Sequence, residues 1–476
     1  MRPESTDSPS PFALSEVEVR DTNAAPAPRP SPALGTNGEG VGPLRLDASA
    51  PGFEAAFAAL VDSRRDTDED VSRDVAAILA DVRARGDAAV AERTLAFDRH
   101  DLAATGWRID RAACRAALDG LDPDLRTAIE LAAARIRAYH EGQRPTDRDT
   151  TDDAGVRLGA RWSAVDAAGL YVPGGRAAYP SSVLMNAIPA KVAGVGRLAM
   201  VTPTPYGEIN PLVLAAAEIA GIDEIWRIGG AQGVAALAYG TDRIAAVDVI
   251  VGPGNAWVAE AKRQLYGRVG IDMVAGPSEI VVVADGGNDP EWIAADLLSQ
   301  AEHDPTSQSI LFTDDAGFAD RVADAVERQL ATLATEAVAR KSWQDNGAIV
   351  LVATLAAAIP LCDRLAPEHL ELAVADPEPL FAKVRHAGSV FLGRHTPEAV
   401  GDYVGGPNHV LPTGRRARFA SGLSVTDFMK RTSFLACDAA SIARIGPAAV
   451  ALAAAEGLPA HGRSVALRLN GSNGQT

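Results

Sequence analysis

The spacing of hydrophobic positions divides the chain into a helical first part and two parts in which strands and helices alternate. Apolar residues recur at every third or fourth position in "DVSRDVAAILADVRARGDAAVAERTLAFDRHD" and again in "PDLRTAIELAAARIRAYHEGQ". This spacing predicts amphipathic helices. After "AVDAAGLYVPGG", short apolar runs typical of buried strands alternate with helical patterns. Such alternation predicts parallel sheets that are covered by helices on both faces.

The first alternating part contains the expected strands "RLAMVTP", "EIWRIGG" and "AVDVIVGPGN", with the helices "PLVLAAAEIAG" and "AQGVAALAYG" between them. The second begins near Gly276 and contains "EIVVVAD", "SILFTD", "AIVLVA" and "AGSVFLG", with a long helix through "RVADAVERQLATL". The last 50 or so residues are helical in pattern and rich in alanine. We therefore expect an α/β fold class with two Rossmann-like parallel-sheet domains and a small helical C-terminal region.

The expected domains follow from these parts. Residues 51–170 and 276–423 are assigned to a discontinuous first α/β domain, residues 171–275 to the second, and residues 424–476 to the C-terminal helical region. Residues 1–50 are rich in Pro, Ser, Gly and Ala, as in "AAPAPRPSPALGTNGEG". They contain too few large apolar side chains to offset the entropy cost of ordering, so they predict a disordered N-terminal tail.

The amino-acid composition excludes several classes of protein to which this chain could belong. The 476 residues carry 45 basic and 62 acidic side chains, a net charge of −17 that argues against sequence-independent nucleic-acid binding. No apolar run reaches the roughly 18 residues of a membrane span, and "MRPESTDSPSPF" lacks the apolar core of a signal peptide. Cys114, Cys362 and Cys437 show no pair spacing, which fits a reducing compartment. We expect a cytoplasmic protein.

A first candidate site lies in "LLSQAEHDP", where a helical pattern runs into a proline. Gln300 and His303 are three residues apart, which places both side chains on one face of a helix. Further candidate ligands follow glycines or prolines in expected loops, where site residues concentrate: Asp402, His409 and His461. A lone loop histidine is more often a surface or capping residue, and glutamine is an uncommon zinc ligand. The pattern alone therefore leaves the metal site open.

The motif "PEHL" is a different signal. On a helix, the adjacent Glu368 and His369 would point some 100° apart, so they could serve two atoms of one substrate as proton-transfer groups. Alternatively, Pro367 begins a helix and Glu368 only offsets the helix dipole. Taken alone, the motif favours this second interpretation.

Three glycine-rich stretches follow expected strands: "YVPGGRAAYPS", "RIGGAQGVAALAYG" and "VIVGPGNAW". Turns of this kind let backbone N–H groups approach a phosphate. The G-x-G-x-x-G fingerprint is absent, so a standard dinucleotide site is weakly supported and ordinary strand-to-helix turns remain an alternative. Three such turns in one segment favour a phosphate-bearing ligand.

These stretches occur in a fixed order together with "GPGNAWVAEAKR", "AGPSEI", "APEHLEL", "AGSVFLG", "GDYVGGPNHVLPT" and "AHGRSVALRLN". The series, over residues 55 to 472, resembles the histidinol dehydrogenase family. The resemblance implies oxidation of L-histidinol to L-histidine through L-histidinaldehyde, with NAD⁺ and zinc, as the last step of histidine biosynthesis.

The resemblance also implies the residues of the site. Gln300, His303, Asp402 and His461 match the family's zinc ligands, one ion per subunit, with His461 supplied by the partner so that each site spans a homodimer interface. Nitrogen and oxygen ligands of this kind accept Zn²⁺ or Mn²⁺, so the native metal stays open.

The remaining roles are implied in the same way. His369 resembles the base that takes the alcohol proton, and Glu368 the group that activates water against the aldehyde. Ser278 and Glu456 match substrate contacts, as do the four metal ligands and His369. The positions that match NAD contacts are Tyr171, Gln232 and Asn255. His409 has no implied role and is expected to be structural.

Two other interpretations fit parts of the pattern. The first is a zinc hydrolase with Glu368 as the base for a metal-bound water. It would have no need of the three NAD-contacting positions. The second is a non-catalytic paralogue that binds metal and a small amine. The presence of all four ligands and both proton-transfer groups argues against it.

Overall fold

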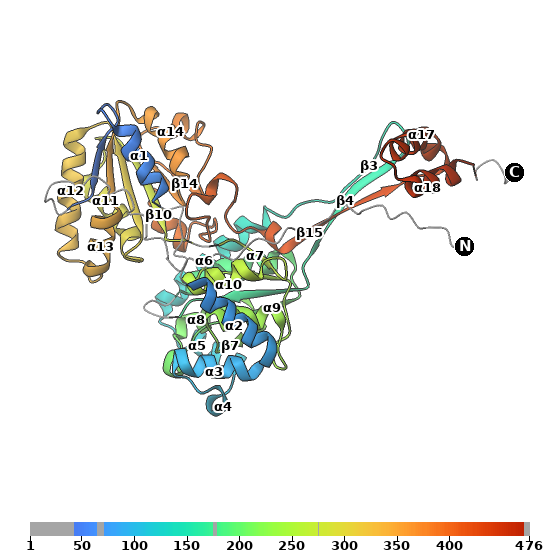
Figure 1. The fold of residues 1–476 in the computed structure, drawn as a ribbon. Coiled ribbons are helices and arrows are strands. Elements are labelled where there is room, and N and C mark those ends of the chain that lie inside the picture. The colour runs from blue at the N-terminus through green and yellow to red at the C-terminus, as the bar shows by residue number, and fades with distance from the viewer. Residues whose placement is uncertain (1–41, 64–70, 175–178, 275, 471–476) are drawn as a thin grey trace, which may run out of the picture. The chain divides into compact units, whose positions relative to one another are not determined.

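The structure is a computed structural model that describes residues 42–63, 71–174, 179–274 and 276–470 (Figure 1). It contains two six-stranded sheets whose central strands are parallel, which confirms the predicted α/β class. Most of the expected N-terminal tail lies outside the described residues. Residues 44–47 were also assigned to that tail, and this was wrong, because they form a strand paired in parallel with residues 348–351. Within the described ranges, no helix is both long and apolar enough to cross a membrane.

The first sheet has the strand order β1-β12-β11-β10-β13-β14. Its strands are β1 (Leu44–Asp47), β10 (Glu279–Ala284), β11 (Gln308–Thr313), β12 (Ala348–Leu351), β13 (His369–Ala373) and β14 (Ser389–Leu392). The strand β10 is entirely buried, as expected of "EIVVVA" in a sheet covered on both faces. The chain winds outward from β10 through β11 to β12 and then returns to β13 on the other side of β10.

Helices cover both faces of this sheet (Figure 1). They are α1 (Phe53–Asp62), α11 (Pro290–Ala301), α12 (Ala316–Leu330), α13 (Glu336–Asn346) and α14 (Leu355–Leu365). Val281 and Val283 pack in one core with α1 and α14, whereas Ile280 and Val282 pack in another with α11 to α13. This division follows from the alternation of side chains along a strand.

The second sheet has the order β2-β7-β6-β5-β8-β9, which is the same winding. Its strands are β2 (Arg108–Ile109), β5 (Ala167–Tyr171), β6 (Arg197–Val201), β7 (Glu224–Trp226), β8 (Val249–Val251) and β9 (Gly270–Ile271). All of its pairs are parallel except the edge pair of β2 with β7. The helices between them are α7 (Pro180–Ala193), α8 (Pro211–Ala220), α9 (Gly230–Tyr239) and α10 (Ala256–Leu265).

The helical segment before β5 accompanies the second sheet. It contains α2 (Ser72–Arg85), α3 (Asp87–Asp98), α5 (Arg111–Asp119) and α6 (Pro123–Glu141). Gly86, at a φ of 54°, separates α2 from α3. Because α2 contacts α9 and α5 contacts α8, this arrangement differs from the expected boundaries, which placed residues 51–170 with the first sheet.

A third sheet was not expected from the sequence. It is antiparallel, with the order β15-β4-β3, and consists of β3 (Arg148–Thr151), β4 (Arg157–Ala164) and β15 (Met429–Ala436). The strand β15 lies in the segment that was expected to be helical throughout. It is followed by α17 (Ala439–Ala455) and α18 (Pro459–Asn470), which pack on each other and do match the prediction.

Candidate functional site

The predicted metal and proton-transfer residues of the first sheet gather where its central strands begin. Ser278 directly precedes β10, and His369 is the first residue of β13. The helix α11 leaves the carboxyl end of β10 and returns the chain to the amino end of β11, so that its last turn carries Gln300 to the same edge. A right-handed strand–helix–strand crossover therefore brings distant positions in the chain together.

Local sequence determines where α11 places Gln300. The Asp289 side chain accepts a hydrogen bond from the Glu291 N–H, and Pro290 occupies the first turn, so the helix begins at a defined residue. Gln300 is then fully buried, and its Nε2 lies 3.0 Å from His303 Nδ1 in the turn that follows. The two side chains therefore meet, although His303 lies beyond the last residue of the helix rather than on one of its faces.

The helical interpretation of "PEHL" is wrong. The helix α14 ends at Leu365, Ala366 adopts a left-handed conformation with a φ of 43°, and β13 begins at His369. The residue before a proline is biased away from the right-handed helical region, which helps to end the helix here. Glu368 precedes the strand, and its Oε2 lies 4.0 Å from His369 Nδ1, so the two side chains approach each other rather than diverge by 100°. Glu368 and His369 are both buried.

One backbone unit of β10 holds both of these side chains. The Glu279 N–H donates to Glu368 Oε2 at 2.9 Å, and the Glu279 carbonyl oxygen lies 3.2 Å from His369 Nδ1. His369 Nδ1 is also 3.0 Å from Gln300 Oε1. Because both neighbours of Nδ1 are carbonyl oxygens, Nδ1 carries the hydrogen and donates it, and the neutral imidazole keeps a lone pair on Nε2.

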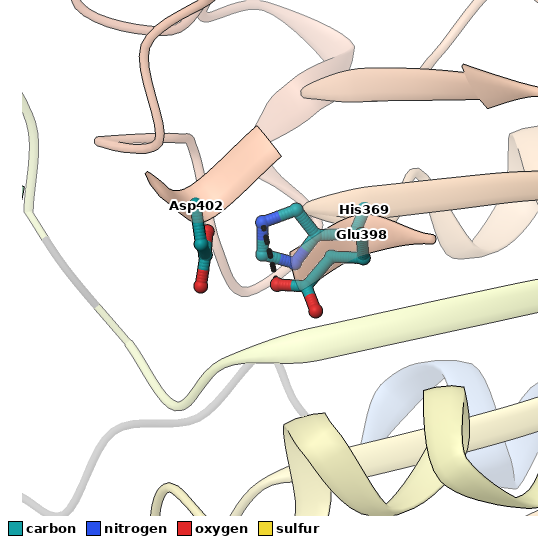
Figure 2. A group of neighbouring side chains, drawn as sticks. All are labelled: His369, Glu398 and Asp402. Atoms are coloured by element: carbon teal, nitrogen blue, oxygen red, sulfur yellow. Dashed lines mark ion pairs between the residues drawn. The ribbon is translucent and has the colours of Figure 1, made fainter. Parts of the chain in front are cut away.

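His369 Nε2 faces two carboxylates. It is buried without a hydrogen-bond partner among the described residues and lies 3.6 Å from Glu398 Oε1. Glu398 and Asp402 are four residues apart on α16 (Glu398–Tyr403), so they share one face of that helix. Figure 2 shows His369, Glu398 and Asp402 around a common point, and one ligand atom from each lies within 4.8 Å of the others.

Burial governs the protonation of this group. It raises the pKa of Glu368 well above its usual range and lowers that of His369 to about 4. Burial and the neighbouring Asp402 raise the pKa of Glu398 to about 9. Burial also opposes ionisation of Asp402, but its hydrogen bond with His409 and the nearby imidazoles hold its pKa at about 2. At neutral pH the His369 imidazole is therefore neutral, Asp402 is ionised and Glu398 keeps its proton.

The donor set fits a divalent cation that accepts nitrogen and oxygen ligands. His369 Nε2 and Glu398 Oε1 are buried atoms without hydrogen-bond partners among the described residues, so the space beside Asp402 is lined by polar atoms that a bound polar group could satisfy. The cluster of His369, Glu398 and Asp402 shares only Asp402 with the ligand set that the resemblance implied. Amide oxygens are also zinc-compatible, and Gln300 and His303 adjoin the cluster through the contact of Gln300 with His369.

Glu456 and His461 lie apart from these contacts. Glu456 is the residue that caps the end of α17, His461 is in α18, and both are exposed. Among the described residues, neither side chain forms a hydrogen bond or ion pair with the cluster at β13 and α16. The single chain thus presents them on its surface.

Sequence reasoning missed Glu398, Glu279 and the role of His409. The spacing of Glu398 and Asp402 on one helix face was a usable signal, whereas the contact of His409 Nδ1 with Asp402 Oδ1 at 3.6 Å depends on the fold of the intervening turn. Two further buried carboxyl groups, Asp296 and Glu371, share a hydrogen bond behind this cluster.

The three predicted NAD-contacting residues follow strands of the second sheet at their carboxyl ends. Tyr171 ends β5, Asn255 caps α10 directly after β8, and Gln232 lies in the first turn of α9 after β7. The strands β5 and β8 are neighbours whose connections leave in opposite directions, since β5 leads to β6 and β8 leads to β9. Doubly wound sheets bind ligands at such a switch point.

Hydrogen bonding and burial fix the side chains at the carboxyl ends of these strands. The Gly230 N–H donates to the Tyr171 hydroxyl at 3.1 Å, and burial raises the pKa of Tyr171 to about 12. Gln232 is 1% exposed, and its Oε1 is buried without a hydrogen-bond partner among the described residues. An orphaned amide oxygen at a switch point is suited to a ligand that donates a hydrogen bond.

Comparisons with known proteins identify the family of this chain. The sequence profile of the family described as histidinol dehydrogenase matches residues 61–469. The histidinol dehydrogenase of Zymomonas mobilis is 67% identical over 427 residues, which cover 90% of this chain and 99% of that protein. That of Rhodospirillum rubrum is 64% identical over 429 residues, again 90% and 99%. The crystal structure of histidinol dehydrogenase from Elizabethkingia anophelis matches with a TM-score of 0.86 and 35% identity, covering 90% of this chain and 99% of that one. This chain belongs to the histidinol dehydrogenase family of oxidoreductases.

Proposed function

We propose that this protein oxidises L-histidinol to L-histidine through L-histidinaldehyde, with two NAD⁺ as hydride acceptors, as the last step of histidine biosynthesis in the cytoplasm. The observation that carries the proposal is the buried His369. Its Nδ1 donates to two carbonyl oxygens, which leaves the lone pair of Nε2 facing a carboxylate-lined space. A neutral imidazole in this tautomer is a general base.

In the first step, His369 Nε2 takes the hydroxyl proton of the alcohol while a hydride leaves the same carbon for the nicotinamide, giving the aldehyde and NADH. In the second step, Glu368 takes a proton from the water as the water oxygen adds to the aldehyde carbon, which leaves the negative charge on the former aldehyde oxygen. Loss of hydride from that carbon to a second NAD⁺ would then give the carboxylic acid. One Glu368 oxygen is occupied by the Glu279 N–H, which orients the carboxyl group and leaves its other oxygen for water. A raised pKa makes Glu368 a stronger base once it is ionised.

A zinc ion would be held by Gln300, His303, Asp402 and His461 of the partner subunit. When bound, it would act as a Lewis acid toward the oxygen of the substrate. Gln300 Oε1 has two lone pairs, so it can accept the His369 N–H and still offer one to the metal. Ser278 at the same edge, together with Glu456 of the partner subunit, would complete the substrate contacts.

The proposed NAD⁺ site is the switch point between β5 and β8, with Tyr171, Gln232 and Asn255. The orphaned Gln232 oxygen supports this assignment.

A homodimer with shared sites is supported by the surface of the C-terminal helices. Exposed leucines accompany the exposed Glu456 and His461 there, including Leu452, which is 64% exposed, and Leu467, which is 63% exposed. Apolar side chains gathered around exposed polar site residues are typical of an interface.

The reaction itself gives the first prediction. Purified protein with L-histidinol and NAD⁺ should form two NADH per histidine, followed by absorbance at 340 nm. Treatment with a chelator should abolish turnover, and added Zn²⁺ should restore it. His303→Ala should lose metal, with a loss of activity beyond the 10–100-fold typical of residues that only support a ligand. Full turnover in protein shown by elemental analysis to be metal-free would refute the metal assignment.

The two proton-transfer groups predict separable steps. Glu368→Gln should slow the oxidation of supplied histidinaldehyde by 10²–10⁴-fold, the usual contribution of a general base. His369→Asn should slow both half-reactions. Zinc content measured in each variant is the control for an intact site. Wild-type aldehyde oxidation by Glu368→Gln would show that another group activates the water.

The low pKa of His369 predicts a dependence of stability on pH. The unfolded chain takes up this proton near pH 6.5, whereas the folded protein resists it down to about pH 4. The stabilisation is therefore complete above pH 6.5 and is lost as the pH falls toward 4, by about 3 kcal/mol. Urea unfolding of chelator-treated wild type and His369→Gln at pH 7 and pH 4 measures it. Equal losses in the two proteins would contradict the assignment.

Shared sites predict complementation between inactive chains. His303→Ala and His461→Ala should each be inactive as homodimers. In a mixed dimer, one site contains both lesions and the other contains neither. After subunit exchange, demonstrated by mass spectrometry, up to a quarter of wild-type activity should return at equal mixing, because half the dimers are mixed and each has one intact site. Absence of recovery would refute sharing of His461.

A further inference from the structure

A buried ion pair that has no part in the proposed chemistry lies beneath the second sheet's glycine-rich loop. Lys262 of α10 and Asp272, which follows β9, form an ion pair, and each side chain is 1% exposed. Removing two charges from water is costly, and well-packed apolar residues often replace such a pair without loss of stability. The pair therefore calls for an explanation other than stability.

Both members of the pair bind the same backbone unit. Lys262 Nζ donates to the Gly252 carbonyl oxygen at 2.9 Å, and Asp272 Oδ2 accepts from the Gly252 N–H at 2.8 Å. The second Asp272 oxygen accepts from the Met273 N–H at 2.6 Å. The two polar groups of Gly252 are thus held by opposite charges in a dry environment, where such hydrogen bonds are strong.

Gly252 is the first residue of the "GPGN" loop, and its position allows no side chain. Its φ is 118°, and an added Cβ would lie 2.1 Å from the Tyr171 carbonyl oxygen. The backbone of the loop therefore packs directly against the backbone at the end of β5. Three residues later, Asn255 caps α10 by accepting from the Val258 N–H at 3.2 Å. Because Lys262 belongs to that same helix, the pair ties the start of the loop to the helix that follows it.

We propose that the Lys262–Asp272 pair is a positioning device for NAD⁺. It holds residues 252–255 against Tyr171 before the cofactor arrives, so that Tyr171 and Asn255 keep a fixed spacing across the switch point. The Tyr171 hydroxyl accepts a hydrogen bond from the Gly230 N–H, so the start of α9, which contains Gln232, is held relative to Tyr171 as well. Neither charged side chain contacts the cofactor. The inference rests on the proposed NAD⁺ site.

The test is a charge-neutral double variant, Lys262→Met/Asp272→Leu. It removes both side-chain hydrogen bonds to the Gly252 backbone without leaving a buried charge unpaired. We expect the Kd for NADH, measured by fluorescence, and the KM for NAD⁺ to rise at least tenfold. The KM for L-histidinol should stay within twofold of wild type, which a general loss of structure would not produce. In Lys262→Met/Asp272→Asn, the amide oxygen can still accept from the Gly252 N–H, so the loss should be smaller.

The matched control is Arg197→Met/Glu224→Gln, which removes an ion pair at the start of β6 and β7, at the opposite edge of the same sheet. Its NADH affinity should be unchanged. A folded Lys262→Met/Asp272→Leu variant with wild-type NADH affinity would overturn the inference, as would an equal rise in both KM values.

A measurement on the wild-type protein covers the case in which the double variants do not fold. Hydrogen exchange without cofactor should show the Gly252 amide already protected, and free exchange there would overturn the inference. Wild-type protein that forms no NADH from L-histidinol would overturn the proposed function as well, so the two failures are distinguishable.

Discussion

The parallel pairing of β10 with β13 is the constraint on which the candidate site depends. Its register places Ile280 opposite His369, so the backbone N–H of Glu279 adjoins Glu368 and its carbonyl oxygen adjoins His369. The backbone of one strand thereby orients two proton-transfer groups on the next. Backbone groups inside a sheet have no rotamer freedom to lose, so they hold a tautomer and a carboxyl orientation more rigidly than a surface side chain could.

The Glu279 side chain extends this support into the core. Its Oε1 lies 3.3 Å from Arg415 Nη1, and both side chains are buried. Arg415 also donates to the carbonyl oxygens of Leu60 and Val61 at the end of α1 and to Gln308 Oε1 on β11. The Arg415 guanidinium thus connects the strand that supports the site to a helix more than 200 residues away in the chain.

The two doubly wound sheets use opposite edges. In the second, the predicted NAD⁺ contacts follow the carboxyl ends of β5, β7 and β8, as the switch-point rule describes. In the first, the buried carboxyl and imidazole groups lie where β10 and β13 begin, because α11 and α16 return the chain to that edge. The same topology therefore places the predicted cofactor contacts at the carboxyl end of the second sheet and a buried group of titratable side chains at the amino end of the first. Burial is the largest cause of the lowered pKa of His369 and of the raised pKa of Glu368.

Much was determined by the sequence alone. The alternation of buried strands and amphipathic helices specified both parallel sheets, because a strand such as "EIVVVA" is apolar on both faces only when helices cover both. The short separation of Gln300 and His303 in the chain favoured their contact, although it forms through the turn after α11 and not along the helix.

The tertiary structure decided the other features. Whether "PEHL" is a helix or a strand depended on pairing with β10. The strands β3, β4 and β15 are largely exposed, so they lack the apolar pattern that would have revealed them. The partnership of Glu398 with His369 and the shifted pKa values of Glu368 and His369 arise from burial and from residues distant in the chain, which no local pattern records.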